Sequence, residues 1–448
     1  MNNFKRALNP PKVLVLGFAL IIAIGTFLLT MPFSTEDGKG LTFLDALFTA
    51  TSATCVTGLI VVDTGDTFSI FGEVVLLFLI QIGGLGFMTF ATLLFLLLGK
   101  KISLKERLLL KEAFNNISIA GLVRLVKRIL LFTACIEIIG GLILSIRFSF
   151  DMPIGKALYF GFFHAISNFN NAGFDLMGGF NGMTAYVDDP FVVFTICALI
   201  TIGGLGFIVM NELYEYRVTK RLSVHSKIVL VTTLLLTVSG TILIFLFEYG
   251  NEKTLGPLSE WGGKVLGSLY QAVTPRTAGS NTLAIGDLTH STLFLMILLM
   301  FIGGAGSGST AGGIKITTFA VLVATMWSQI RGKEDVVLFK RRIVTETILK
   351  ALTVTMCGGL IVVVVTIILS ITEQHHSFMM YLFEATSAFG TVGLSMGLTP
   401  PELTPAGRLL LIITMFVGRV GPLTIAFAIA KRRKKESFRH PKGNIMIG

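Results

Sequence analysis

Eight apolar stretches, each close to 20 residues long or longer, most strongly limit how this chain can fold. They cover residues 13–31, 74–99, 129–146, 191–210, 228–247, 293–327, 351–371 and 409–430. A helix crosses the hydrocarbon core of a bilayer with about 20 apolar residues. Only 14% of the 448 residues are charged, whereas soluble domains carry about 25%. The pattern therefore predicts an all-α polytopic membrane protein.

The basic residues are grouped in alternate connections between these stretches. The segments 1–12, 100–128, 212–227, 331–350 and 431–448 hold 28 of the 37 Lys and Arg residues. Lys and Arg accumulate in the cytoplasmic connections of membrane proteins. We therefore expect a multi-pass protein of the cell membrane with both termini in the cytoplasm. This topology explains the net charge of +11 without nucleic-acid binding.

Four similar segments lie in the other connections. Each reads aromatic, polar, Ala, β-branched, hydroxyl, at 48–52, 163–167, 270–274 and 383–387. A glycine follows five or six residues later, at Gly58, Gly173, Gly279 and Gly393. A glycine-rich tetrapeptide follows again, at 83–86, 203–206, 303–306 and 418–421. Four matches in the same order indicate an internal repeat. Its unit is a span, a re-entrant half-helix, a glycine loop and a second span.

The repeat divides the chain into four units and a tail. The predicted boundaries are 1–99, 100–217, 218–342 with an intramembrane gating loop, 343–430, and a basic cytoplasmic tail over 431–448. We expect the four covalently linked repeats to surround one central pore. Non-helical backbone at membrane depth is tolerated only where it is buried in protein or lines a watery cavity.

The loop residues that end at the four glycines carry no carboxylate. They are Val56, Thr57 and Gly58; Asn171, Ala172 and Gly173; Thr277, Ala278 and Gly279; and Thr391, Val392 and Gly393. Such loops offer backbone carbonyls, and rings of carbonyls replace the hydration shell of potassium. The alternative is four tight turns in which glycine only relieves crowding, but this explains less well why all four occur in register. The sequence predicts a potassium filter.

A run of eleven small residues interrupts the sixth apolar stretch. It contains Gly303, Gly304, Gly306, Ser307, Gly308, Ser309, Thr310, Gly312 and Gly313. The run lacks the G-x-x-x-x-G-K-[ST] order of a phosphate loop, so we expect this chain to bind no nucleotide. Small residues also allow close helix crossing, which needs only a few of them. The run predicts a flexible intramembrane loop, and the adjacent Lys315 either anchors it or extends to the cytoplasm.

Arg419 replaces a glycine that the other three tetrapeptides retain. An arginine within a span faces a cavity or a partner. One interpretation is a pore-facing charge that raises the barrier to cations, and the other is an ion pair, for example with Glu137. We favour the first, because the other tetrapeptides are expected to face the axis. His164 is predicted to be a hydrogen-bonded residue of its half-helix.

Three motifs are specific enough to suggest a family. They are TPRTAG at 274–279, SAFGTVGL at 387–394 and FVGRVGP at 416–422. Over essentially its whole length the chain resembles the Trk/Ktr/HKT superfamily of potassium transporters, and in particular the membrane subunit of bacterial Ktr systems. The resemblance implies that the four glycines line a K+ filter, and that Gly58 marks the potassium-selective form, because relatives with Ser there tend to pass sodium.

The same resemblance implies a gate and partners. The run 303–313 is expected to lie below the filter and obstruct the pore together with Arg419. Na+ is implied as a coupling or activating ion. A cytosolic ring of nucleotide-binding subunits, KtrA/KtrC-like, is expected to regulate the pore, and the membrane subunit is expected to form a homodimer.

Two other classes of function compete with this interpretation. A cation-coupled secondary transporter with a midplane site uses paired broken helices in two halves, and the sequence predicts a break only in the stretch 293–327. An intramembrane enzyme needs a nucleophile with its base and acid, and no such set is visible. We therefore predict a transporter and not an enzyme.

Overall fold

The computed structural model describes residues 10–86, 89, 122–258, 260–304, 306, 309–399 and 403–429. Helices account for nearly all of the regular structure in these ranges, as predicted. Short 3-10 turns are η1 (Pro32–Ser34), η2 (Thr184–Tyr186) and η3 (Ile285–Asp287). The described strands form one small antiparallel hairpin, β1 (Val337–Leu338) with β2 (Arg341–Arg342), in which Val337 pairs with Arg342.

Each repeat begins with a long helix that is able to cross a membrane. These helices are α2 (Pro10–Leu29), α8 (Leu122–Phe148), α12 (Val224–Glu248) and α16 (Thr345–Thr372). Within the described ranges, they are the helices that are long and apolar enough to span a bilayer by themselves. Only 28–33% of their most apolar windows is buried inside the protein. Their remaining surface is therefore available to lipid.

The half-helices predicted from the repeat are present. They are α3 (Phe43–Cys55), α9 (Ile154–Phe169), α13 (Trp261–Val273) and α17 (Phe378–Gly390). They have 13 or 16 residues and rise about 20–24 Å, too little to cross the bilayer. Thr42 and Ser377 cap the amino ends of α3 and α17 by accepting hydrogen bonds from backbone N–H groups. Both helices end in a left-handed residue, and the glycine loops begin there.

The second span of every repeat ends at its glycine-rich tetrapeptide. These helices are α5 (Ile70–Leu85), α10 (Pro190–Leu205), α14 (His290–Ile302) and α18 (Pro405–Val420). The chain bends by 97° between α10 and α11 (Phe207–Thr219). It resumes as α15 (Ile316–Ile330) after the glycine-rich run and as α19 (Pro422–Ile429) after Gly421.

Two predictions about these spans are therefore wrong. The stretches 191–210 and 409–430 are not continuous helices, and the sixth stretch is not the only broken one. Gly206 and Gly421 have φ of 94° and 90°, values that glycine reaches without the penalty of a side chain. Apolar residues flank both glycines, so hydropathy does not reveal the breaks. The predicted stretch 74–99 is described only to Gly86 and at residue 89.

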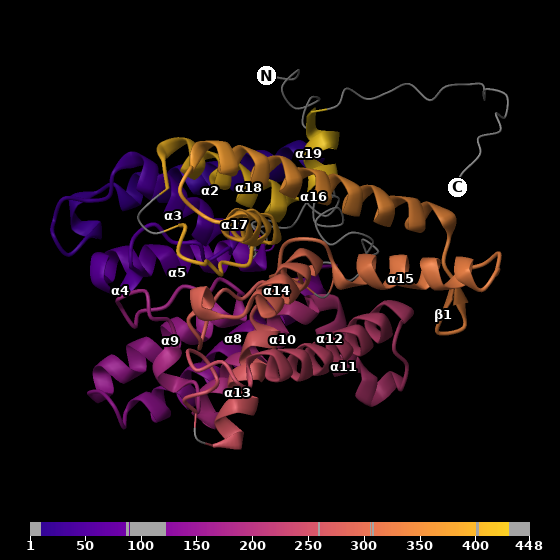
Figure 1. Cartoon of the computed structure of the whole chain (residues 1–448), viewed down its shortest axis with the longest axis horizontal. Helices are drawn as coiled ribbons and strands as arrows, with labels where there is room; N and C mark the ends of the chain where they lie inside the picture. The colour runs from indigo at the N-terminus through magenta and orange to yellow at the C-terminus, as the bar shows by residue number, and fades with distance from the viewer. Residues whose placement is uncertain are drawn as a thin grey trace.

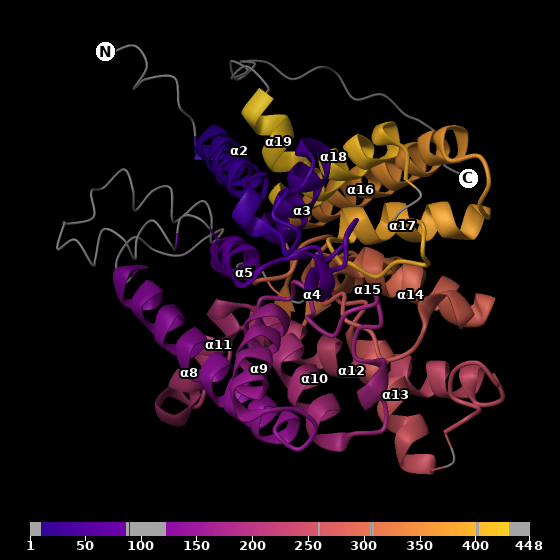
Figure 2. The same ribbon diagram turned by 90° about the vertical axis from the view of Figure 1, so that its left-hand side faces the viewer.

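The repeats close into a ring. α5 packs on α9, α10 on α13, α14 on α17, and α18 returns to α3. The second span of each repeat thus contacts the half-helix of the next. Figure 2 shows the four repeats in order around the centre, from indigo through magenta and orange to yellow. Four covalently linked repeats around one pore, as predicted from the sequence, are the architecture of this protein.

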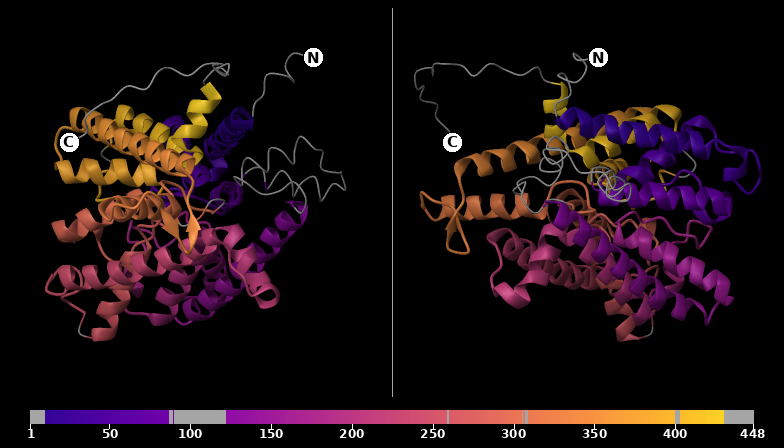
Figure 3. Two further views of the ribbon diagram at one scale, coloured as in Figure 1. Left: turned by 90° about the vertical axis from the view of Figure 1, so that its right-hand side faces the viewer. Right: turned by 180° about the vertical axis from the view of Figure 1, so that it is seen from behind.

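The two faces of the ring carry different elements. α4 (Thr64–Thr67) and the β-hairpin lie at opposite ends of the molecule in Figure 1. The hairpin extends from the end of α15 on the face shown at the left of Figure 3. The basic residues Arg341 and Arg342 belong to this hairpin, so part of the predicted cytoplasmic charge lies on the face opposite α4.

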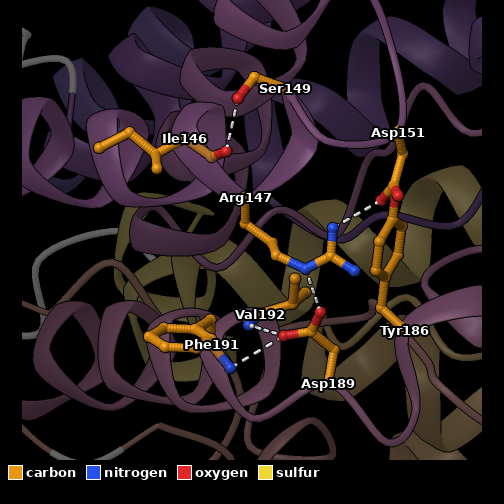
Figure 4. A network of polar contacts seen from close by, with 8 residues as sticks. All are labelled: Ile146, Arg147, Ser149, Asp151, Tyr186, Asp189, Phe191 and Val192. Carbon is orange, nitrogen blue, oxygen red and sulfur yellow. Dashed lines mark hydrogen bonds and ion pairs between the residues drawn. The ribbon is translucent and has the colours of Figure 1, made fainter.

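A polar network in the second repeat joins the end of α8 to the start of α10 (Figure 4). Arg147 of α8 forms ion pairs with Asp189 and, at 2.7 Å, with Asp151. The Asp189 carboxylate also caps α10, because it accepts hydrogen bonds from the N–H groups of Phe191 and Val192 at 2.9 and 3.1 Å. The network therefore fixes the ends of α8 and α10 relative to each other.

Candidate functional site: a ring of four pore loops

The hydroxyl residue of each repeat attaches the glycine loop to its half-helix. One backbone contact recurs in all four repeats: the N–H groups of Thr57, Ala172, Ala278 and Val392, each directly before the glycine, donate to the carbonyls of Ser52, Ser167, Thr274 and Ser387 at 2.8–2.9 Å. The hydroxyls add a second bond. Ser52 and Ser387 accept from the N–H groups of Gly58 and Gly393, and Ser167 and Thr274 donate to the carbonyls of Phe174 and Ser280.

The backbone of the four loops shares one unusual conformation. The residue two positions before each glycine has a positive φ: 56° at Val56, 60° at Asn171, 74° at Thr277 and 50° at Thr391. Positive φ is a genuine outlier for β-branched residues. Such strain, on the order of 1–3 kcal/mol for each residue, persists only where the surroundings determine it, and it is concentrated at functional sites.

The four glycines and four carbonyls form a closed ring. A Cβ atom added to Gly58 would lie 2.3 Å from the carbonyl oxygen of Ala172. An added Cβ atom would lie 2.3 Å from the carbonyl oxygen of Ala278 at Gly173 and 2.5 Å from that of Val392 at Gly279. At Gly393 it would lie 2.2 Å from the carbonyl oxygen of Thr57. Each glycine therefore faces the carbonyl of the next loop, and the fourth loop returns to the first. No side chain fits at these positions.

All four glycines line one cavity of about 280 Å³. Polar residues from the segments beyond the glycines, Asp175, Asn281 and Ser395, also border it. Of the twelve predicted filter residues, the four glycines line this cavity, and the carbonyls of Thr57, Ala172, Ala278 and Val392 face those glycines. Among the described residues, the buried hydroxyls of Thr57, Thr277 and Thr391 have no hydrogen-bond partner. Carbonyl and hydroxyl oxygens suit a monovalent cation that exchanges its water, and Asp175 places one carboxylate at the border of the cavity.

The glycine-rich run packs against the fourth loop of this ring. A Cβ atom on Gly312 would lie 2.0 Å from Oγ1 of Thr391, and one on Gly313 would lie 3.2 Å from Cα of Gly390. Gly306 faces the carbonyl oxygen of Leu205 in the same way, at 2.5 Å. Glycine is therefore required for the close fit. The predicted gate residues Ser307 and Gly308 lie outside the described residues, as does Ala305.

Arg419 lies against this run. Its guanidinium donates hydrogen bonds to the carbonyl of Thr310 in the run and to the carbonyl of Gly83 at the end of α5. No acidic side chain in the described part of the chain forms an ion pair with Arg419. Glu137, the alternative partner, instead accepts from Asn170 at 3.0 Å and Gln81 at 3.3 Å.

Lys315 and His164 have the local roles that the sequence suggested. The Lys315 ammonium donates to the carbonyls of Ala311 at 2.5 Å and Gly312 at 3.4 Å. Of the two roles considered, it therefore anchors the run. His164 is fully buried. One ring nitrogen lies 2.7 Å from the carbonyl of Phe160, and the other accepts from the N–H of Leu176 at 3.3 Å.

Sequence reasoning missed one residue that stabilises the fourth loop by a hydrogen bond. Glu384 occupies the polar position of its repeat, is fully buried, and accepts a hydrogen bond from the hydroxyl of Ser395 beyond Gly393. His164 makes the equivalent contact in the second repeat. Both residues occupy the polar position of the repeat pattern, and this shared position could have identified Glu384 from the sequence. At this position the side chain holds the segment that follows the pore-loop glycine.

The geometry defines a class: a multi-pass membrane protein whose four pore loops surround one axis. Residues 8–440 match the TrkH family model, described as cation transport protein, and the chain belongs to this family. It is 49% identical to the Ktr system potassium uptake protein B of Bacillus subtilis, over 98% of this chain and 97% of that one. The resemblance to Ktr membrane subunits is confirmed, and the family consists of transporters, not enzymes.

Two further similarities agree with this assignment. The potassium/sodium uptake protein NtpJ of Enterococcus hirae is 40% identical over 99% of this chain and 98% of its own length. The crystal structure of the potassium transporter TrkH from Vibrio parahaemolyticus matches with a TM-score of 0.71 at 16% identity, covering 93% of this chain and 83% of that one. At this identity the match supports the fold.

Proposed function

We propose that this chain is the potassium-translocating membrane subunit of a Ktr-type uptake system, of the KtrB/KtrD type. The closed ring, in which each glycine faces the carbonyl of the next loop, carries the proposal. Carbonyl oxygens take the place of the water around K+. The membrane potential contributes about 2.3 kcal/mol per charge per 100 mV and drives the ion inward. The names of the relatives, which mention potassium uptake, support the choice of ion.

Ion-specific uptake tests this proposal directly. The chain is expressed with its regulatory partner in a strain that lacks its own potassium transporters, and uptake of K+, Rb+ and Na+ is measured. We expect K+ uptake to restore growth at low external potassium. An inserted protein that moves none of these ions would contradict the proposal. Repeating K+ uptake without sodium tests whether Na+ is a coupling or activating ion, as the name of NtpJ suggests.

The glycine-rich run and Arg419 are proposed to form the gate. The run packs against Thr391 of the ring and Leu205 of α10, and we infer that it lies in the path of an ion that leaves the ring. A fixed positive charge on Arg419 adds electrostatic repulsion along the same path. We propose that a cytosolic nucleotide-binding ring of the KtrA/KtrC kind moves the run aside.

The same proposal includes the assembly and the topology. We infer a homodimer in the cell membrane, with both termini cytoplasmic and with repeat boundaries near residues 99, 217, 342 and 430. A cation-coupled secondary transporter is the alternative, and the breaks after α10 and α18 favour it more than the sequence did. Flux through reconstituted protein separates the two, because a coupled transporter moves K+ only in fixed proportion to a second ion.

A further inference from the structure

Thr310 links the glycine-rich run directly to one of the pore loops. Its hydroxyl donates a hydrogen bond of 2.7 Å to Oδ1 of Asn171. Both residues have no exposed surface. Asn171 lies two positions before Gly173 and is one of the four pore-loop residues with positive φ described above. The contact therefore joins the glycine-rich run to a residue with strained backbone within the ring itself.

The side chain of Asn171 is held at both ends of its amide. Oδ1 accepts from Thr310, and Nδ2 donates to the carbonyl of Ile200 at 3.3 Å. Gly203 leaves room for this amide, since a Cβ atom there would lie 2.9 Å from Oδ1. A side chain fixed at two atoms also restricts the backbone that carries it. That backbone continues into Ala172, whose carbonyl faces Gly58 in the ring.

The other side of Thr310 is bound to the fourth repeat. Its carbonyl accepts from the guanidinium of Arg419, which also donates to Gly83 of the first repeat. One residue of the run thus contacts a pore loop through its side chain and the arginine through its backbone. A hydrogen bond of 2.7 Å does not survive a displacement of more than about 1 Å. Any movement that takes Thr310 out of the pore breaks the contact with Asn171.

We propose that the Thr310–Asn171 hydrogen bond is a latch that couples the gate to the filter. This inference rests on the proposed function of the run as the gate. With the run in place, the latch stabilises the closed state and holds the second pore loop in one geometry. When the run withdraws, Asn171 loses its donor and that loop relaxes. Because coupling between two sites is reciprocal, ion binding in the ring and closure of the run then influence one another.

The change Thr310→Val tests the latch, because it keeps the shape of the side chain and removes the donor. Basal K+ flux through reconstituted protein without the regulatory subunit is expected to rise about fivefold, the equivalent of about 1 kcal/mol for one buried hydrogen bond. Thr310→Ser retains the donor and should restore closure. Thr366→Val is the matched control, since that buried hydroxyl bonds only within α16.

Ion binding supplies a readout that a packing defect would not change in the same way. K+ affinity of the full-length protein in detergent is measured by calorimetry for the parent, for Thr310→Val, and for a variant lacking residues 306–312. We expect Thr310→Val to shift the affinity toward that of the deletion variant. Combining Thr310→Val with Asn171→Gly, which tolerates the positive φ, should be less than additive.

The outcomes separate the latch from the gate on which it rests. If the deletion raises flux and changes K+ affinity while Thr310→Val does neither, the latch is refuted and the gate stands. If the deletion leaves flux at background in an inserted protein, the gate is refuted and the latch with it. If Thr310→Val and Asn171→Gly are fully additive in flux and affinity, the two residues act independently and the coupling is refuted.

Discussion

The change Gly58→Ser tests whether the ring selects the ion. A Cβ atom on Gly58 lies 2.3 Å from the carbonyl oxygen of Ala172, and contacts under 3.0 Å are essentially never found. Either the carbonyl or the residue that carries the new side chain must move by about 0.7 Å, the difference between these two distances. The obstacle is backbone, so it cannot rotate away as a flexible side chain would.

Two energies follow from this geometry. A non-glycine residue at φ of 87° costs about 1–2 kcal/mol in backbone strain. Displacing one carbonyl removes part of a contact between a dipole and an ion, and a hydrogen bond to a charged group is worth roughly 1.5–3 kcal/mol. If about 1.4 kcal/mol of the preference for K+ depends on that carbonyl, selectivity falls about tenfold. We expect relatively more sodium to pass.

The assay is the ratio of K+ to Na+ uptake under matched gradients. Gly58→Ala carries the same Cβ atom without a hydroxyl and should act like Gly58→Ser. Gly38→Ala is the control, because Gly38 also has a positive φ of 68° but a Cβ atom there meets nothing within 4 Å. An unchanged ratio in both Gly58 variants would refute the reasoning. A change with Ser and none with Ala would assign the effect to the hydroxyl instead of the collision.

Three further predictions address the proposed gate, the Arg147–Asp189 network and the topology. Deleting residues 306–312 should raise K+ flux through proteoliposomes, and Arg419→Ala should raise it more mildly. The combined variant should be less than additive if both changes act on one barrier. Background flux from an inserted deletion variant would place the gate elsewhere. Asp189→Ala should lower the free energy of unfolding by roughly 1–2 kcal/mol, because it removes both the helix cap and the ion pair. Asp189→Asn should lower it by less, because the amide oxygen still caps α10. Equal thermal midpoints for the two variants would argue against the cap. A cytoplasm-active reporter fused after Gly448 should be active, and a reporter that works only outside the cell should be silent; the reverse result would overturn the orientation.

The repeat was predictable because each loop is held by contacts between residues that are close in sequence. A hydroxyl residue five or six positions before a glycine is close enough in sequence to be recognised, and its backbone carbonyl accepts the same hydrogen bond from the loop in all four repeats. The half-helices were predictable because the aromatic–polar–Ala–β-branched–hydroxyl pattern and the following glycine mark all four of them in the sequence. These features need no knowledge of which segments meet.

The breaks and the long-range contacts were not predictable in this way. Gly206 and Gly421 lie within apolar stretches, and a positive φ leaves no mark on hydropathy. Thr310 meets Asn171 from 139 positions away, and Arg419 meets Gly83 from 336 positions away. Glu137 illustrates the same limit: its charge suggested a cationic partner, whereas two amides that converge in space satisfy its oxygens.

The closed ring, not the number of broken spans, favours a gated pore over alternating access. Breaks after α10 and α18 remove the argument that only one span is interrupted. Rocking the first two repeats against the last two, however, would separate Gly173 from Ala278 and Gly393 from Thr57, two of the four contacts that close the ring. Moving the glycine-rich run does not pull neighbouring repeats apart in this way, and it alters the ring only through the Thr310–Asn171 contact. Because the run meets the ring through glycines and a few hydrogen bonds, its displacement disturbs far less packed backbone than rotation of one half.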